Sequence, residues 1–245
     1  MRAVLLAAGR GRRLDADRPK CLIDIEGKTL LDRHLRNLAA AGIEALTVVV
    51  GYEQQKVREH VGRHCVPYPL PIDFIENADF TRGSIVSLGR AMHRLTEAGG
   101  IFMDADVLYP TALMKRLVRS KHDNCVLIDT RSEETGEEMM VGVKQGRVRA
   151  IARKVSPLAA SLGPFDVVGE AVGFAKVSKA GAEVLDRIIS AELEAGRLDQ
   201  EYEAAMNIAF GEIAWGHELV SDFEWTEIDF QEDVEKARRI ARGEI

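Results

Sequence analysis

Glycines and basic residues follow the first apolar stretch of this chain at a spacing that could bind an anion. Residues 3–6 (Ala-Val-Leu-Leu) predict a buried strand, and Gly9, Gly11 and Pro19-Lys20 come after it, with arginines between them. A glycine loop behind a strand can expose backbone N–H groups to a phosphate, because no Cβ blocks the approach. The loop therefore predicts a phosphate site, with a plain surface loop as the alternative.

Two familiar glycine fingerprints do not fit this loop. A dinucleotide-binding G-x-G-x-x-G motif would need glycine where Leu14 stands, and an acid at the end of the second strand, where the chain has Gly51-Tyr52. A Walker A loop needs Gly-Lys followed by Ser or Thr, and the sequence contains no such run.

A pair of acids ends a later apolar stretch. Asp104 and Asp106 lie two residues apart in the segment 101–109, which reads as a strand, so their side chains should point the same way and could face one cation. Mg²⁺ prefers carboxylate oxygens together with phosphate oxygens. A solvated strand end is the alternative, because D-x-D is a common pattern.

The elements that must position these residues alternate between strands and helices over residues 1–129. Residues 45–50 and 124–130 read as strands, and residues 83–100 as a helix with Ser84 as its N-cap. Such alternation predicts an α/β fold, a Rossmann-like mixed and mainly parallel sheet flanked by helices, with ligands at the carboxyl ends of the strands.

From Thr130 the pattern changes. Residues 139–154 predict a hairpin that turns at Gln145-Gly146, and a strand, two helices, a strand pair (217–222 with 225–229) and a closing helix follow. We expect a single domain over residues 1–245, in which residues 130–245 form a smaller inserted β/α lid, with the closing helix, on the sheet of residues 1–129.

Composition restricts the classes of partner. The net charge of −6 and the pI near 5.6 argue against nucleic acid. Cys21, Cys65 and Cys125 are far apart, so neither a zinc site nor a disulfide framework is indicated. No apolar run approaches the roughly 18 residues of a membrane span, and no signal-peptide pattern is present. We therefore expect a cytoplasmic protein without membrane insertion.

The string Gly9-x-Gly11-x-Arg13-Leu14, followed by Pro19-Lys20, resembles the signature of nucleotidyltransferases that activate sugar phosphates and small phospho-alcohols. With the later stretches 168–174, 201–207 and 227–237, the chain looks most similar to the bacterial choline-phosphate cytidylyltransferase group and its relatives acting on inositol phosphate or aminoalkylphosphonate. The resemblance implies CTP as donor, Mg²⁺ as cofactor, release of pyrophosphate and, by analogy only, a homodimer.

The resemblance also implies roles for individual residues. Arg13 would spread charge over the departing pyrophosphate, and Lys20 would act at the α-phosphorus. Asp106 would hold the metal, with Asp229 or Glu227 completing the site. The residues expected around the nucleotide are Leu6, Ala7, Ala8, Gly9, Gly11, Arg12, Asn77, Gly83, Ser84 and Asp104.

The expected acceptor-binding residues are Lys154, Glu170, Tyr202, Glu203, Trp225 and Glu227. Lys154 stands where relatives bind the acceptor's phosphate, although a charged strand end is an equal alternative. Choline-specific relatives carry aromatic residues near the segment 133–143, which has none here. Core packing competes with acceptor binding for Tyr202 and Trp225. A polyol phosphate or an amine-bearing phosphate would fit the glutamates as well as phosphocholine.

The implied reaction needs no general base, because the acceptor's phosphate oxygen is already anionic when it attacks the α-phosphorus of CTP. Three alternatives stay open. These are a sugar-1-phosphate nucleotidyltransferase that uses UTP, GTP or dTTP, a nucleotide-binding regulator without catalysis, and an enzyme that guanylylates a molybdenum cofactor.

Overall fold

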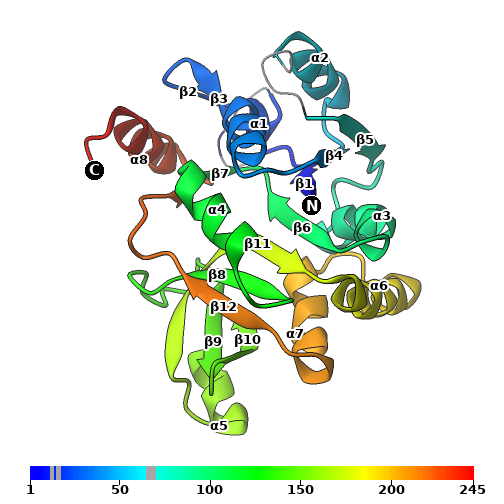
Figure 1. Cartoon of the computed structure of the whole chain (residues 1–245), viewed down its shortest axis with the longest axis vertical. Coiled ribbons are helices and arrows are strands. Elements are labelled where there is room, and N and C mark those ends of the chain that lie inside the picture. Colours follow the sequence, from blue (N-terminus) through cyan, green and yellow to red (C-terminus); the bar gives the residue numbers. More distant parts are fainter. Residues whose placement is uncertain (12–13, 15–17, 65–69) are drawn as a thin grey trace.

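The computed structural model describes residues 1–11, 14, 18–64 and 70–245, whose elements are drawn in Figure 1. The strands are β1 (Arg2–Ala7), β2 (Asp24–Ile25), β3 (Lys28–Thr29), β4 (Ala45–Val50), β5 (Ile72–Glu76), β6 (Gly100–Asp104), β7 (Val107–Leu108), β8 (Cys125–Asp129), β9 (Met140–Lys144), β10 (Arg147–Ala152), β11 (Val167–Val177), β12 (Gly216–Leu219) and β13 (Thr226–Glu227). The α-helices are α1 (Leu30–Ala40), α2 (Gln54–His64), α3 (Ser84–Thr96), α4 (Thr111–Arg119), α5 (Ala159–Leu162), α6 (Lys179–Glu194), α7 (Tyr202–Glu212) and α8 (Gln231–Arg242). Short 3-10 helices cover Lys20–Leu22 and Ser156–Leu158.

One large mixed sheet runs through the molecule in the order β10-β9-β11-β6-β1-β4-β5, with β8 beside β11 and β12 beside β8. β1 pairs in parallel with β4 and β6, and β4 pairs in parallel with β5. β11 runs antiparallel to β6, β8 and β9. The predicted α/β fold, a mixed sheet flanked by helices, is confirmed, and the N-terminal half supplies a parallel block of strands.

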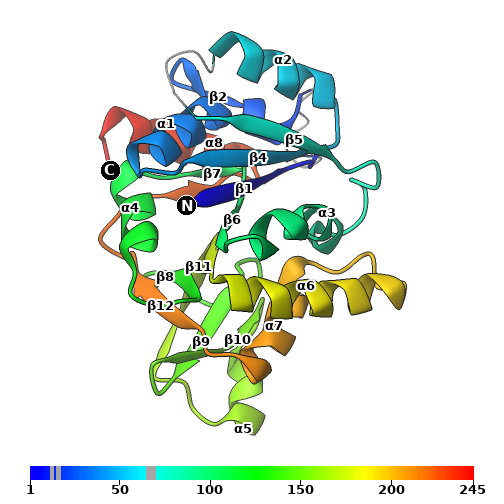
Figure 2. The same cartoon turned by 45° about the vertical axis from the view of Figure 1, so that its right-hand side comes forward.

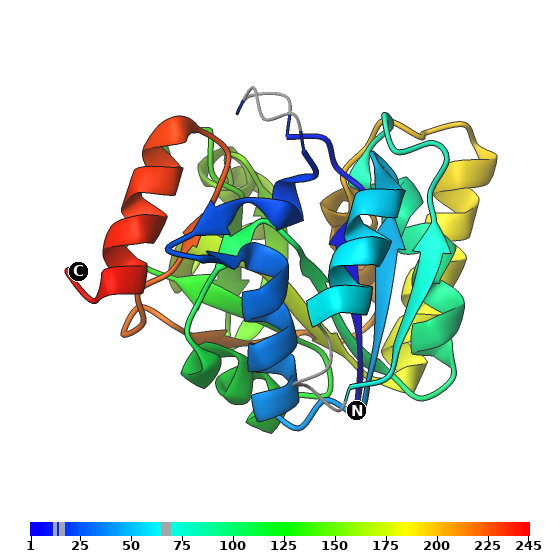
Figure 3. The same cartoon turned by 90° about the horizontal axis from the view of Figure 1, so that it is seen from above.

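Alternating side chains of β1 divide the core into two layers. Ala3 and Leu5 face the layer that contains α1 and α4, whereas Val4 faces the layer that contains α3, α6 and α7. Figure 2 shows α1 and α4 on one side of the sheet and α3 and α6 on the other. Seen from above in Figure 3, α8 and α6 lie at opposite ends of the molecule. None of the helices in the described ranges combines the length and apolar character needed to span a membrane.

The start of α3 differs from its prediction. The helix begins at Ser84, and Gly83 occupies the N-cap position without any side chain to cap it. The residues before α7 approach so closely that a Cβ on Gly83 would lie 2.0 Å from the Gln200 carbonyl oxygen. Prediction of Ser84 as the N-cap was therefore wrong, because a tertiary contact that demands glycine decides where the helix starts.

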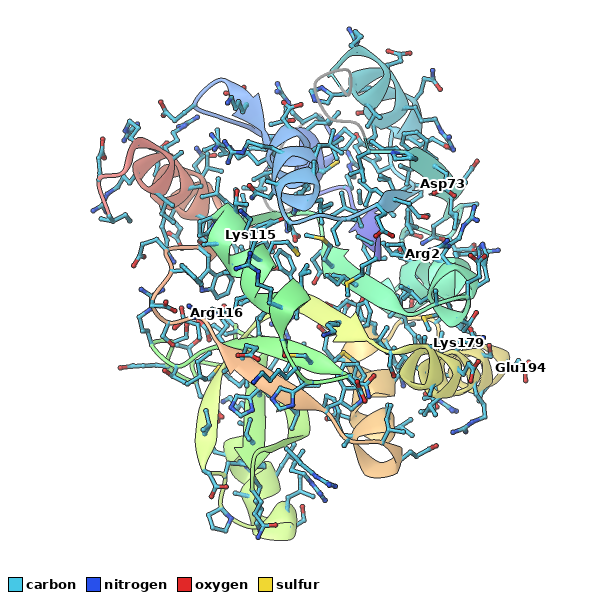
Figure 4. The ribbon with its side chains drawn as sticks, viewed as in Figure 1. Arg2, Asp73, Lys115, Arg116, Lys179 and Glu194 are labelled. Atoms are coloured by element: carbon cyan, nitrogen blue, oxygen red, sulfur yellow. The ribbon has the colours of Figure 1, made fainter. Side chains whose placement is uncertain are left out.

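The second half of the chain continues the main sheet. The predicted hairpin is confirmed as β9 and β10, which turn at Gln145 and Gly146, both with positive φ. The predicted strand pair is wrong, since β12 pairs with β8 and β13 pairs with β7. Arg116 of α4 reaches the end of β12 and donates to the Leu219 carbonyl oxygen at 2.6 Å (Figure 4).

Candidate active site

Lys20 lies where the glycine loop meets the carboxyl ends of the strands. Its ammonium donates to Asp106 Oδ2 at 2.7 Å and to Asp229 Oδ1 at 2.5 Å. Burial by itself would lower the pKa of Lys20, but the charges of the two carboxylates outweigh it and hold the pKa above its usual value. Gly11 lies against the lysine, because a Cβ on Gly11 would lie 3.1 Å from Lys20 Cγ. Gly11 of the glycine loop and Lys20 are therefore neighbours in the structure.

Three carboxylates gather around this lysine, and we call them the acid cluster. Asp106, Glu227 and Asp229 each place an oxygen within 4.8 Å of the other two. The short ladder between β7 and β13 brings them together, since Glu227 pairs with Val107 and the Ile228 N–H donates to the Asp106 carbonyl oxygen at 3.0 Å. Backbone pairing, not a flexible loop, therefore joins these acids across the chain.

The acid cluster fits a hard divalent cation. Its donors are carboxylate oxygens, the ligands that Mg²⁺ prefers together with phosphate oxygens and water. Asp106 Oδ1 is buried and has no hydrogen-bond partner among the described residues, and an unpaired buried oxygen is costly unless a ligand meets it. Desolvation, followed by the charges of Asp106 and Asp229, raises the pKa of Glu227 to about 8. A bound cation would relieve this repulsion.

Asp104 has different partners from Asp106. The Tyr202 hydroxyl donates to Asp104 Oδ2 at 2.6 Å, and a Cβ on Gly173 would lie 2.5 Å from the same oxygen. Desolvation, then the charges of Asp106 and Glu203, hold the pKa of Asp104 well above its usual range. Asp104 is therefore enclosed by neighbouring elements, whereas Asp106 faces Lys20.

Two adjoining cavities meet at the acid cluster. The first, of about 340 Å³, is lined by Lys20, Ser84, Asp104, Asp106, Val107, Glu137, Met139, Arg153, Ala171, Val172, Gly173, Glu201, Tyr202, Glu203, Glu227 and Asp229. The second, of about 530 Å³, shares Glu137, Glu227 and Asp229 with it. A ligand in one cavity and a ligand in the other would thus meet beside Lys20 and the acid cluster.

Acidic side chains dominate the second cavity. Its acids are Asp129, Glu133, Glu137, Glu138, Glu170, Glu224, Glu227, Asp229, Glu232 and Asp233, against the cations Arg131 and Lys236. Ser132 donates a hydrogen bond to Glu170, whose pKa is raised, chiefly by desolvation. Trp225 is 5% exposed, and its Nε1–H donates to Asp129 Oδ2 at 2.8 Å. The walls therefore favour a ligand group with positive charge.

The residues expected around the nucleotide form two groups in the structure. Leu6, Ala7 and Ala8 lie at the end of β1, where Leu6 pairs with Asp104 of β6, and Gly9 and Gly11 continue from there. Arg12 and Arg13 fall outside the described residues.

At α3, Gly83 and Ser84 are held by the segment that leads into α7. The Gly83 N–H donates to Leu198, the Ser84 N–H donates to Glu201, and the Ser84 hydroxyl accepts from the Tyr202 N–H. Ser84 nevertheless lines the first cavity.

Asn77 is placed in the interior. It is 1% exposed, its Nδ2 donates to Ser87 Oγ at 2.9 Å, and its Oδ1 accepts from the Asp79 N–H at 3.0 Å. Both polar atoms of its side chain are thus hydrogen-bonded within the protein.

Lys154 lies apart from the other residues expected to bind the acceptor. It is exposed and lines neither cavity, whereas its neighbour Arg153 lines the first cavity and donates to the Glu137 carbonyl oxygen at 2.5 Å. Glu170, Trp225 and Glu227 line the second cavity, and Tyr202, Glu203 and Glu227 line the first.

Sequence reasoning missed Arg131, Glu137, Arg153 and Lys236 as residues that line the cavities. The run of acids at 133–138 was a usable signal for this wall, because a strongly negative stretch attracts cationic groups.

Two curated relatives align with long parts of the chain. The bifunctional IPC transferase and DIPP synthase of Rubrobacter xylanophilus is 38% identical over 150 residues, which are 60% of this chain and 33% of the relative. The CMP-5'-(3-aminopropyl)phosphonate synthase of Streptomyces rubellomurinus is 26% identical over 248 residues, which are 97% of this chain and 38% of the relative. The chain thus matches 33% and 38% of the lengths of these two proteins.

Solved structures share the fold over the whole chain. The CTP:phosphocholine cytidylyltransferase of Streptococcus pneumoniae superposes with a TM-score of 0.76 at 18% identity, covering 98% of both chains. The inositol-1-phosphate CTP transferase of T. maritima gives 0.75 at 20% identity, covering 99% of this chain and 96% of its own. The model of the MobA-like NTP transferase domain matches residues 3–188, most of the chain described above. On that match, the chain belongs to the MobA-like NTP transferase family.

Proposed function

We propose that this protein transfers a cytidylyl group from CTP to a phosphate or phosphonate oxygen of a small acceptor and releases pyrophosphate. The observation that carries the proposal is the junction of two cavities at Lys20 and the acid cluster. Relatives and structural neighbours whose names include CMP or CTP support the choice of cytosine nucleotide.

The two cavities suit the two substrates. The first cavity opens beside Lys20 and the start of α3, as expected for the nucleotide, although residues after position 129 supply most of its lining. The second cavity is formed almost wholly by residues after position 129. The division into a nucleotide-binding half, residues 1–129, and an acceptor-binding half, residues 130–245, stays part of the proposal.

The chemistry requires charge and alignment more than proton transfer. An acceptor phosphate oxygen is already anionic and can attack the α-phosphorus without a base, and no histidine lines either cavity in the described part of the chain. Lys20 would stabilise the charge that develops at the α-phosphoryl group. Asp106, Asp229 and Glu227 would hold Mg²⁺, which supplies charge neutralisation for the triphosphate when bound.

The acceptor that fits best carries a protonated primary amine. The second cavity is lined mainly by carboxylates, and an ammonium group offers three N–H donors to them. A quaternary ammonium offers none and relies on aromatic faces. The aromatic residues of this wall are Trp225, which is 5% exposed, and Phe230. An aminoalkyl phosphate or phosphonate therefore suits the cavity better than phosphocholine or a polyol phosphate.

The test is pyrophosphate release with Mg²⁺, crossing CTP, UTP, GTP, ATP and dTTP with 2-aminoethylphosphonate, 3-aminopropylphosphonate, phosphocholine, inositol 1-phosphate and glucose 1-phosphate. We expect release with CTP and an amine-bearing acceptor, and none from the Lys20→Ala variant. Release with UTP, GTP or dTTP and glucose 1-phosphate would instead make the protein a sugar-1-phosphate nucleotidyltransferase. Tight CTP binding without release in any combination would contradict the proposal and favour a nucleotide-binding regulator.

A further inference from the structure

A histidine lies in the apolar core beneath the acid cluster. His34 of α1 is 0% exposed, its Nε2 lies 3.2 Å from the Ala105 carbonyl oxygen, and its Nδ1 lies 3.3 Å from the Tyr109 hydroxyl. A carbonyl oxygen only accepts, so Nε2 must carry the proton. Nδ1 is then the acceptor for the Tyr109 O–H. The two contacts together specify one tautomer of a neutral ring.

Asn37 holds the same segment one turn further along α1. It is 0% exposed, its Nδ2 donates to the Tyr109 carbonyl oxygen at 2.9 Å, and its Oδ1 accepts from Thr111 Oγ1 at 2.6 Å. His34 and Asn37 thus attach α1 to the first and last residues of the segment 105–111, Ala105 and Thr111. That segment contains Asp106 and β7, the strand that pairs with β13 and so brings Glu227 and Asp229 into place.

Stability alone does not explain these two polar residues. The other fully buried side chains of α1 are leucines, namely Leu30, Leu31, Leu35 and Leu38. Apolar residues would bury this face without the desolvation cost that an imidazole and an amide bring. Fully paired buried polar groups instead fix one arrangement of the segments they join. The segment fixed here carries the metal-facing aspartate.

We propose that His34 is a positioning residue for the acid cluster, because it holds the Ala105 carbonyl and thereby directs Asp106 toward Lys20 and Asp229. The inference rests on the proposed function, which gives Asp106 its task. The next carbonyl along is held by another segment, since Asp106 O accepts from the N–H of Ile228, which follows β13. With both carbonyls fixed, the backbone on either side of the Asp106 Cα has little freedom to rotate.

The charge state of His34 agrees with this role. Burial lowers the pKa of His34 to about 4, so the ring stays neutral at the pH of an assay. Its Nδ1 therefore remains an acceptor for Tyr109, and its Nε2–H remains directed at Ala105.

The experiment compares Mn²⁺ binding, in the presence of CTP and without acceptor, in the full-length wild type and in His34→Leu, His34→Gln and Tyr109→Phe. Titration calorimetry gives the affinity. Outer-shell partners of metal ligands typically change affinity by about 10–100-fold. We expect His34→Leu to lose Mn²⁺ affinity by about tenfold or more. The substitution should change kcat more than it changes the KM for CTP. His34→Gln, whose amide N–H can still reach Ala105, should recover most of the affinity.

Leu38→Ala is the matched control, since Leu38 is equally buried on the same helix face and makes only apolar contacts with its side chain. It should reduce thermal stability and leave the Mn²⁺ affinity unchanged. If His34→Leu folds poorly, Tyr109→Phe still tests the inference, because it removes the hydroxyl that holds Nδ1 and should lower the affinity by a smaller factor.

The outcomes separate the two claims. Equal Mn²⁺ affinity in wild type, His34→Leu and Tyr109→Phe would overturn the inference and leave the proposed function intact. Equal losses in His34→Leu and Leu38→Ala would show a structural effect only and would also overturn it. A wild type that binds no Mn²⁺ with CTP would overturn the proposed function, and the inference with it.

Discussion

Replacing Lys20 by methionine should expose how strongly the acid cluster depends on a cation. Methionine keeps a flexible apolar stem of similar reach but has no charge. In the variant, Asp106 and Asp229 lose the ammonium that now donates to both, at 2.7 and 2.5 Å. Glu227, whose pKa is raised by desolvation and by the charges of Asp106 and Asp229, stays close to them. The folded protein should therefore lose stability through repulsion among carboxylates.

The size of the loss follows from the exposure of the groups. Removing one partner of a fully buried ion pair costs about 3–5 kcal/mol, and an exposed pair contributes about 0–1 kcal/mol. The Lys20 side chain is 15% exposed, and those of Asp106 and Asp229 are 20% and 35% exposed. We therefore expect a loss of about 2 kcal/mol without metal. For a chain of this length, that lowers Tm by about 4–8 °C.

The assay is thermal unfolding of wild type, Lys20→Met and the exposed-site control Lys28→Met, first in EDTA and then with increasing MgCl₂. The control should unfold like the wild type. Mg²⁺ should raise the Tm of Lys20→Met more than that of the wild type, because the metal takes over the neutralising charge. Transferase activity should stay lost. An unchanged Tm in EDTA, or equal Mg²⁺ shifts in wild type and variant, would refute the reasoning.

Three further predictions concern the walls of the first cavity. Gly173→Ala should destabilise by about 1–2 kcal/mol or more, because its φ is +78° and its Cβ would lie 2.5 Å from Asp104 Oδ2; Gly62→Ala, where a Cβ meets nothing within 4 Å, is the matched control in urea unfolding. Tyr202→Phe should cost about 1 kcal/mol of stability and lower kcat/KM, and unchanged values of both would show that the hydroxyl contact with Asp104 is dispensable. Desolvation raises the pKa of Glu203 from 4.5 to about 7, so its ionisation opposes folding as pH rises through that range, by at most about 3 kcal/mol. Glu203→Gln should therefore be more stable than wild type at pH 8, and this advantage should disappear below pH 4. A constant difference across pH would contradict this assignment.

The parallel half of the fold and its edge residues could be predicted because the signals are local. An apolar strand followed by glycines places Gly11 and Lys20 at the carboxyl edge of the sheet, and a second apolar strand places Asp106 at the same edge. Parallel strands end side by side, so sequence order implies proximity there. Whether Trp225 packs in the core or binds the acceptor does not follow from the sequence, because an aromatic residue can do either.

Single-residue assignments depend on tertiary geometry. Lys154 was predicted to bind the acceptor, and the structure places its neighbour Arg153 on the wall of the first cavity. Both residues follow the end of β10 at Ala152, in irregular backbone whose side-chain directions no strand period predicts. Tertiary contacts also determine the environment of Asn77, which hydrogen-bonds to Ser87 on the following helix. At the start of α3, the close approach of Gln200 requires glycine at position 83, and Gly83 rather than Ser84 therefore takes the N-cap position.

The sequence by itself determined the family, the glycine loop with Lys20, and the aspartate that faces it, because these features depend on short stretches of chain. Only the tertiary structure decided that Glu227 and Asp229 join Asp106, since a two-residue ladder between β7 and β13 makes that contact. It also decided that Tyr202 bonds to Asp104 and that His34 holds Ala105. Such contacts join segments far apart in sequence, and their geometry follows from the packing of the whole core.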